Sequence, residues 1–229
     1  MRILALDTST GPASIAITQS GEVIATHQDM QSMHQSRLLV NATNTLIEAN
    51  GGYAALDAMA VSTGPGGFTG IRIALAAARG FALACDKPLL GISSLEAFAW
   101  QALHNSSESA KAVVYINAFR KQAYVQAFTR TANAMQALCA AQAIDMLEAP
   151  AFYAQYSDSD TVALGNIAEA ELEISGYQQH DAPKAKFVAL YAEALLADNN
   201  MPEVAATRPA EAFYIRPPDA KPQKPLLNV

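Results

Sequence analysis

The stretch RILALDTSTGPASIAITQSGEVIATH, residues 2–27, decides the fold. Residues 2–7 form a short apolar run, residues 13–19 alternate between apolar and polar, and residues 22–27 follow a tight turn at Ser20-Gly21. The first two patterns are typical of β-strands, and a two-residue turn joins neighbouring strands in antiparallel order. The chain is therefore predicted to open with three antiparallel strands in a meander.

After residue 27, the spacing of the apolar residues changes from that of a strand to that of a helix. Helices are predicted over 36–49, over 69–85 and after Ser93, where Glu96 three positions later completes a capping box. Strands are predicted over 56–63 and 88–92. This order predicts an α/β fold with a mixed five-stranded sheet and helices on both faces. It is the ribonuclease H-like topology of the actin-like ATPase superfamily, also called ASKHA.

The second half of the chain has weaker patterns. A strand pair is predicted over 111–117 and 122–129, with short strands at 138–141 and 161–164, a partly helical segment over 143–156 and a helix from 183 to about 196. The expected organisation is a first domain over 1–104, with a C-terminal helix packing back on it, and a smaller domain over 105–200. A proline-rich tail over 201–229 is expected to be extended, and partly disordered after Pro218.

Composition excludes several classes of protein. With 51% hydrophobic and 16% charged residues, the 229-residue chain is not intrinsically disordered. A net charge of −6 disfavours a free-standing nucleic-acid binder. Two cysteines provide no disulfide framework, and no run of 18 apolar residues occurs, so a cytoplasmic protein without a membrane span is expected.

Two loops could contact phosphate. Asp7-Thr8-Ser9-Thr10 lies between two strands, where actin-like ATPases hold a nucleotide phosphate, but an ordinary hairpin turn explains it equally well. The loop GPGGFTG, residues 64–70, precedes a helix but matches neither the Walker nor the dinucleotide fingerprint. These patterns predict at most a weak remnant of a phosphate site at residues 7–10.

The helix predicted over 69–85 is apolar on two sides. One stripe contains Ile71, Ala74, Leu75, Ala78, Phe81 and Ala82, and a second stripe contains the small residues Ala76, Gly80 and Ala84. A helix that is apolar on both sides is covered on both sides. Either the domain itself covers both sides, or one side docks a partner. Small residues let another helix approach closely, which favours docking on the second stripe.

Metal and nucleophile motifs do not occur in the sequence. Histidines 27, 34, 104 and 180 show none of the usual zinc spacings, and no G-x-S-x-G elbow is present. No metal ligand and no catalytic residue are therefore expected.

Three segments together resemble the TsaB (YeaZ) family of tRNA threonylcarbamoyladenosine biosynthesis proteins. They are LALDTST at 4–10, LDAMAVSTGPGGFTGIRIALAAARGFAL at 56–83 and PLLGISSLEAFA at 88–99. HQSRLLV at 34–40 and FYIRP at 213–217 also fit. The family usually has serine at position 67, and Asp-Ala-Arg where this chain has Asn117-Ala118-Phe119-Arg120.

The resemblance implies two ribonuclease H-like halves, the second degenerate. It implies a non-catalytic scaffold subunit that pairs with the catalytic subunit TsaD and the ATPase TsaE. Together these would transfer threonylcarbamoyl to N6 of adenosine 37 in tRNAs that read ANN codons, with tRNA contacted only indirectly. A homodimer is expected when TsaD is absent. No cofactor is expected, except ATP or ADP at a subunit junction.

The expected interface combines the helices predicted over 36–49 and 69–85. Its candidate residues are Leu39, Thr43, Ile47, Phe68, Arg72, Ala76, Arg79 and Gly80. The alternative function is an independent actin-like ATPase or small-molecule kinase that uses the loop at residues 7–10. A glycoprotease-type peptidase is the third interpretation, and no nucleophile–base pair in the sequence supports it.

Overall fold

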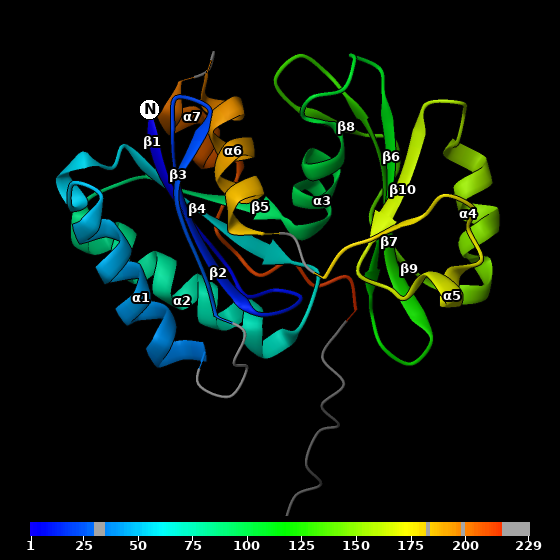
Figure 1. Cartoon of the computed structure of the whole chain (residues 1–229), viewed down its shortest axis with the longest axis horizontal. Helices are drawn as coiled ribbons and strands as arrows, with labels where there is room; N and C mark the ends of the chain where they lie inside the picture. Colours follow the sequence, from blue (N-terminus) through cyan, green and yellow to red (C-terminus); the bar gives the residue numbers. More distant parts are fainter. Residues whose placement is uncertain (30–34, 182–183, 198–199, 217–229) are drawn as a thin grey trace, which may run out of the picture.

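The computed structural model describes residues 1–29, 35–181, 184–197 and 200–216. Figure 1 shows two lobes side by side, each built on one β-sheet, with helix α3 between the sheets. The fold is α/β with the ribonuclease H-like strand order that the sequence predicts. The segment expected to be disordered after Pro218, and His34 of the 34–40 segment, lie outside the described residues.

The first sheet is the predicted mixed five-stranded sheet, in the order β3-β2-β1-β4-β5. The first three strands pair antiparallel, β4 pairs parallel with β1, and β5 pairs parallel with β4. The strands are β1 (Arg2–Asp7), β2 (Ala13–Gln19), β3 (Glu22–Asp29), β4 (Ala58–Gly64) and β5 (Leu89–Ser93). Alternate side chains of β1 enter two different cores, because successive residues of a strand point to opposite faces.

Helices cover both faces of this sheet (Figure 1). α1 (Gln35–Ala49) and α2 (Phe68–Cys85) pack on one face, and α6 (Ala185–Leu196) packs on the other. The short 3-10 helix η2 (Tyr53–Ala55) precedes β4. α3 (Ser94–Leu103) begins at Ser93 with the predicted capping box, in which Leu95 N donates to Ser93 Oγ and Ser93 N donates to Glu96 Oε2.

The second sheet repeats the strand order of the first. Its order is β11-β10-β6-β7-β8, with β9 also paired to β7. β6 and β7 are antiparallel, whereas β10 and β11 run parallel to β6, as β4 and β5 run parallel to β1. The intervening helices are shorter than in the first lobe, so the chain is a duplication with a degenerate second half. The elements are β6 (Lys111–Asn117), β7 (Gln122–Arg130), β8 (Met135–Ala137), β9 (Gln142–Asp145), η3 (Met146–Glu148), α4 (Ala149–Tyr156), β10 (Thr161–Gly165), α5 (Glu169–Leu172) and β11 (Gln178–Gln179).

The last helix of each half packs against the sheet of the other half. α3 contacts β6, β7 and β10 of the second sheet, and α6 contacts β1, β2 and β4 of the first. One hydrophobic core therefore contains residues of both sheets and both helices. This exchange interlocks the lobes, and the division into 1–104, 105–200 and 201–229 stays a prediction.

Two expectations about irregular segments are wrong. The strand expected over 138–141 is a connection between β8 and β9. The start of the tail is helical rather than extended, since α7 spans Met201–Thr207. Pro202 lies in the first turn of α7, where a missing N–H breaks no helical hydrogen bond.

After α7, residues 208–216 run across the first lobe to the second. Gly91 N donates to Arg208 O, and Phe213 N donates to Thr63 O. Arg216 then donates to Ala118 O and Gln122 Oε1 in the second lobe. This segment, residues 208–216, is called the strap below.

α2 is long and apolar enough to cross a membrane by length and composition alone, which differs from the expectation drawn from the sequence. In the structure one of its faces packs on the first sheet, and Ile71, Ala74, Leu75, Ala78 and Ala82 are buried there. A core helix of a globular domain has the same length and composition, so these two properties are weak evidence for a membrane span.

Candidate functional site

The loop after β1 is folded upon itself. Asp7 is completely buried, and its Oδ1 accepts hydrogen bonds from Ser9 N at 3.0 Å and Ser9 Oγ at 2.7 Å. Ser94 Oγ at the start of α3 donates to Ser9 Oγ. Burial raises the pKa of Asp7, and the hydrogen bonds from Ser9 oppose that shift. A carboxylate in this position has no exposed face for a hydrated cation.

The glycine loop before α2 packs directly onto this first loop. Gly67 N donates to Ser9 O at 2.6 Å, and Thr8 Oγ1 donates to Gly70 O. A Cβ atom on Gly66 would lie 2.2 Å from Ser9 O, and one on Gly70 would lie 1.9 Å from Thr8 O. Both positions therefore require glycine for close approach of two backbones. Thr8 Oγ1, Ser9 Oγ and Gly67 N therefore form hydrogen bonds within the chain, whereas Asp7 Oδ2 and Thr10 Oγ1 have no hydrogen-bond partner among the described residues.

A cleft of about 390 Å³ separates this pair of loops from the second lobe. Its second-lobe wall contains Asn117, Phe119, Asn166 and Asp181, and Asn166 Oδ1 accepts a hydrogen bond from Asn117 N. The described residues that line it include no lysine or arginine. The actin-like fold implies a nucleotide here, but a buried aspartate and a lining without cations do not fit a triphosphate with Mg²⁺.

Replacing Asp7 by asparagine is expected to raise the free energy of unfolding at pH 7 by on the order of 1 kcal/mol. Asparagine keeps an acceptor for Ser9 and removes the buried charge. The folded-state pKa of Asp7 lies above its ordinary value of 3.8. The stabilisation that comes from protonation of Asp7 is therefore complete below pH 3.8, and it is lost as the pH rises through the folded-state pKa. Urea unfolding at pH 3.5 and pH 7 measures the difference. Equal stability of variant and native protein at both pH values would contradict the argument.

Within the described ranges, no group of three or more His, Cys, Asp or Glu side chains could hold a metal ion. Cys85 and Cys139 both have free thiols and lie in different lobes.

The outer face of α2 is exposed, and Arg72 and Arg79 are its charged residues. Ala76, Gly80 and Ala84 are exposed along it, as the four-residue spacing predicts, and Leu83 is 85% exposed. A groove of about 600 Å³ runs between α1 and α2, lined by Val40, Phe68, Thr69, Arg72, Ile73, Ala76 and Ala77. Val40 and Phe68 are about two-fifths exposed there. An apolar groove between two helices is a suitable binding site for a partner helix.

The strap packs against two residues that line this groove, Phe68 and Arg72. The guanidinium of Arg72 lies 3.6 Å from the centre of the Phe68 ring and donates to Tyr214 Oη at 3.1 Å, and Tyr214 stacks on Phe68. Arg79 donates to Ala210 O. Both arginines, predicted as interface residues, therefore hold the strap against α2 while their side chains remain exposed.

The structure does not place the α1 residues of the predicted interface on the surface. Leu39, Thr43 and Ile47 are buried in the first lobe, facing the sheet. The exposed face of α1 instead carries Val40 and Asn44. Sequence reasoning missed Val40 and Tyr214. Val40 follows two leucines, so periodicity alone does not decide which of the three faces inward, and Tyr214 reaches the groove only through the path of the strap.

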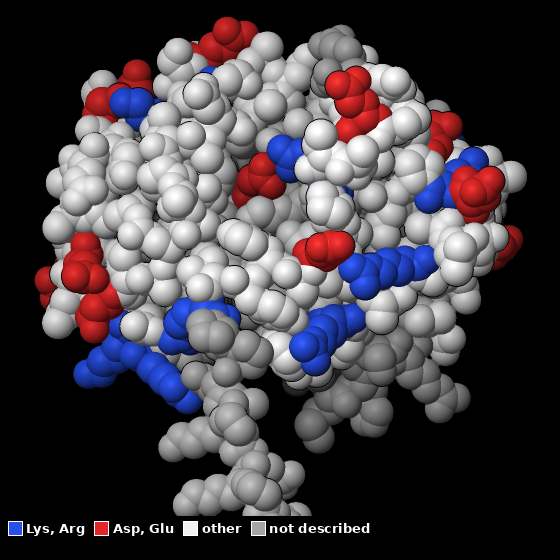
Figure 2. All heavy atoms as spheres, turned by 180° about the vertical axis from the view of Figure 1, so that it is seen from behind, with Lys and Arg blue, Asp and Glu red and all other residues white. Residues whose placement is uncertain are grey.

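Figure 2 shows Lys and Arg side chains gathered along the lower part of one face, with few Asp and Glu side chains among them. Higher on the same face, Lys and Arg side chains lie close to Asp and Glu side chains. The net charge of the whole chain is −6.

Comparison with known proteins places these features in a family. Residues 22–200 match the family model described as "TsaD: tRNA N6-adenosine threonylcarbamoyltransferase". The tRNA threonylcarbamoyladenosine biosynthesis protein TsaB of Haemophilus influenzae is 34% identical over 130 residues, 57% of this chain and 55% of the relative. TsaB of Escherichia coli is 32% identical over 133 residues, 58% of this chain and 57% of the relative. The chain thus spans little more than half the length of these curated relatives in the matches.

A solved structure shows the same fold over nearly the whole chain. YeaZ from Pseudomonas aeruginosa superposes with a TM-score of 0.75 at 23% identity, covering 93% of this chain and 99% of the other. The names TsaB and YeaZ agree with the resemblance noted from the sequence. The chain belongs to the family described by the TsaD model, and it is similar to TsaB proteins over little more than half of its length.

Proposed function

We propose that this protein is a non-catalytic partner subunit in tRNA threonylcarbamoyladenosine biosynthesis, and that it docks a TsaD subunit on the outer face of α1 and α2. The observation that carries the proposal is the exposed stripe of Ala76, Gly80 and Ala84 beside the apolar groove. Small side chains allow helix axes to approach closely. The names of the relatives support the pathway.

The choice of TsaD as partner follows from the shared fold. Because this chain matches the TsaD family model over residues 22–200, a TsaD subunit carries helices equivalent to α1 and α2. Two such faces can meet as a four-helix interface related by a pseudo-twofold axis. The same geometry allows a homodimer when TsaD is absent, and the ATPase TsaE would join the resulting complex in the cytoplasm. tRNA would then bind mainly to TsaD.

Ala76→Arg is expected to weaken association with TsaD by about a hundredfold, or roughly 2.7 kcal/mol. The new guanidinium would be buried without a partner where two helices meet. Since Ala76 is exposed in the single chain, the thermal midpoint should not change. Size exclusion of the chain mixed with TsaD from the same organism measures binding.

The matched control is Ala154→Arg, which places the same side chain on an exposed position of α4 in the other lobe. It should bind TsaD as the native chain does. A folded Ala76→Arg variant that still elutes with TsaD at native affinity would refute the interface.

The second candidate is an independent actin-like ATPase or kinase, which the cleft of about 390 Å³ between the lobes favours. Its weakness is the local chemistry, because Asp7 is buried and Ser9 is bonded within the chain. Any ATP or ADP would bind where a partner supplies the missing cations, at a subunit junction. ATP turnover by the purified chain that Asp7→Ala abolishes would favour this candidate over the scaffold.

A further inference from the structure

A second pocket, of about 750 Å³, lies away from both the cleft and the α1–α2 groove. It is bounded by the β2–β3 turn at Ser20 and Gly21, by the end of α3 at Trp100 and His104, and by α6. Its volume is in the range of pockets that hold small molecules. Its lining therefore combines residues of both exchanged helices with the β2–β3 turn of the first sheet.

Glu193 of α6 gives this pocket an unusual electrostatic character. The residue is only 8% exposed, and its Oε1 accepts a hydrogen bond from Gly21 N at 2.9 Å. Its Oε2 is buried without a hydrogen-bond partner, and the described part of the chain provides no ion pair for this carboxylate. A buried carboxylate is costly unless a cation compensates it.

The imidazole of His104 also lines the pocket, but its hydrogen bonds go to groups other than Glu193. His104 Nδ1 lies 3.0 Å from Trp100 O, and His104 Nε2 lies 3.0 Å from Asn105 Nδ2. Both ring nitrogens therefore contact other residues, and the described part of the chain shows no ion pair between His104 and Glu193.

The remaining lining is aromatic and aliphatic. The rings of Trp100 and His104 lie 6.3 Å apart, and Leu190 and Ala194 of α6 lie across from them. The Nε1 of Trp100 is also buried without a hydrogen-bond partner among the described residues. Aromatic faces beside a carboxylate favour organic cations over anions, because the ring faces are electron-rich.

We propose that this pocket binds a small organic cation, with an ammonium head beside Glu193 and an apolar body against Trp100, Leu190 and Ala194. The cation compensates the buried carboxylate, and the apolar body fills the rest of the pocket. An anionic ligand would face the unpaired charge of Glu193 and is disfavoured.

Trp100 is the single tryptophan of the chain, so its fluorescence reports on this pocket. The probe is 2-phenylethylamine, which is protonated at pH 7, and the matched neutral probe is 2-phenylethanol. The amine is expected to change the fluorescence saturably in the millimolar range, and the alcohol to bind about tenfold more weakly. Glu193→Gln keeps an acceptor for Gly21 N and should remove the preference for the amine. Glu169→Gln, an exposed change on α5, is the matched control.

A second measurement needs no variant. The amide of Gly21 donates to Glu193, so its NMR signal in the native protein should shift when the amine binds. Equal binding of amine and alcohol, an unchanged preference in Glu193→Gln, or shifts confined to residues far from Gly21 would each overturn the proposal. The absence of any saturable response to the amine would overturn it as well.

Discussion

Gly70→Ala is expected to lower the free energy of unfolding by about 4 kcal/mol, which is at the upper end for a single substitution. The added Cβ would lie 1.9 Å from Thr8 O. The obstacle is backbone, so no side chain can rotate away to relieve it. The two loops are also fastened to each other through Gly67 N and Ser9 O, so they cannot separate without losing hydrogen bonds.

Gly80→Ala is the matched control, because it changes the same residue type in the same helix. A Cβ at Gly80 would meet no heavy atom within 4 Å. Alanine in an exposed helical position should stabilise the chain by about 0.5–1 kcal/mol. Urea unfolding compares the free energies of unfolding of the two variants. The dependence of that free energy on urea concentration is expected to stay unchanged. Equal effects of both substitutions would show that the loop contact is not needed for stability.

The first lobe could be predicted from the sequence because its elements are long and their patterns differ clearly. The alternating run of β2, the apolar run of β1 and the capping box at Ser93 each identify one element. The order of these elements then restricts the sheet to few topologies, since parallel strands need crossover helices. The duplicated strand order of the second lobe did not follow from pattern, because β8, β9, β11 and α5 have two to four residues each.

The candidate interface was predictable on α2 and not on α1. On α2, the buried stripe contains the large residues Ile71 and Leu75, whereas Ala76, Gly80 and Ala84 are all small, so the two faces are distinguishable. On α1, Leu39, Val40 and Ile47 are all large and aliphatic, and only the packing of the fold decides that Val40 faces outward. The pocket at Glu193 depends on α6 reaching the β2–β3 turn, a contact between residues 172 positions apart. No local pattern contains that information.

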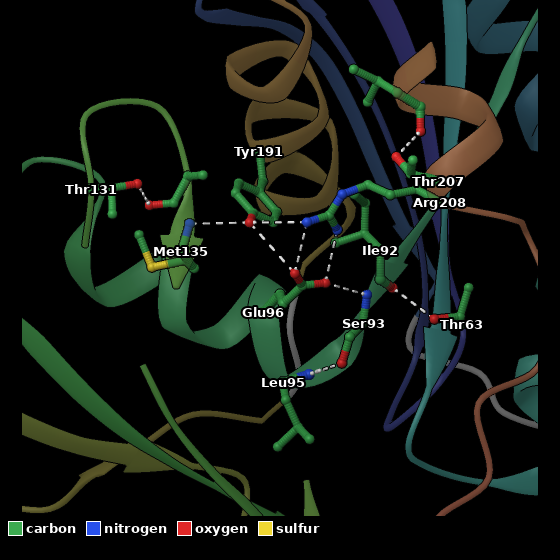
Figure 3. Close-up of polar contacts among 12 residues, drawn as sticks. Thr63, Ile92, Ser93, Leu95, Glu96, Thr131, Met135, Tyr191, Thr207 and Arg208 are labelled. Carbon is green, nitrogen blue, oxygen red and sulfur yellow. Dashed lines mark hydrogen bonds and ion pairs between the residues drawn. The ribbon is translucent and has the colours of Figure 1, made fainter. Parts of the chain in front are cut away.

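The strap is anchored by a mostly buried ion pair, shown in Figure 3. Arg208 Nη1 and Nη2 donate to the two carboxylate oxygens of Glu96 at 3.1 and 3.0 Å, and the side chains are 23% and 17% exposed. Tyr191 Oη accepts a hydrogen bond from Met135 N at 3.1 Å and lies 3.5 Å from Glu96 Oε1. Burial, together with Glu96, raises the pKa of Tyr191 to about 12. One network thus joins α3, α6, the strap and β8.

Arg208→Met is expected to lower the free energy of unfolding by about 3 kcal/mol, because it leaves Glu96 buried without its cation. Methionine retains most of the aliphatic volume, so the loss reports on charge rather than packing. The double variant Glu96→Gln with Arg208→Met should recover part of that loss, since neither charge then remains buried. Lys111→Met is the control, because its exposed pair with Asp158 contributes about 0–1 kcal/mol.

Hydrogen exchange separates detachment of the strap from general weakening of the fold. The amide of Gly91 donates to Arg208 O, whereas the amide of Met135 donates to Tyr191 Oη on the other side of the network. In Arg208→Met, exchange at Gly91 should accelerate more than exchange at Met135, because the strap loses its side-chain anchor while Tyr191 stays packed on Trp100. The strap also packs Tyr214 against Phe68 and Arg72 of the groove, so the same variant should weaken association with TsaD. Equal acceleration at both amides with native affinity for TsaD would show that Glu96 and Arg208 stabilise the core and leave the docking face unaffected.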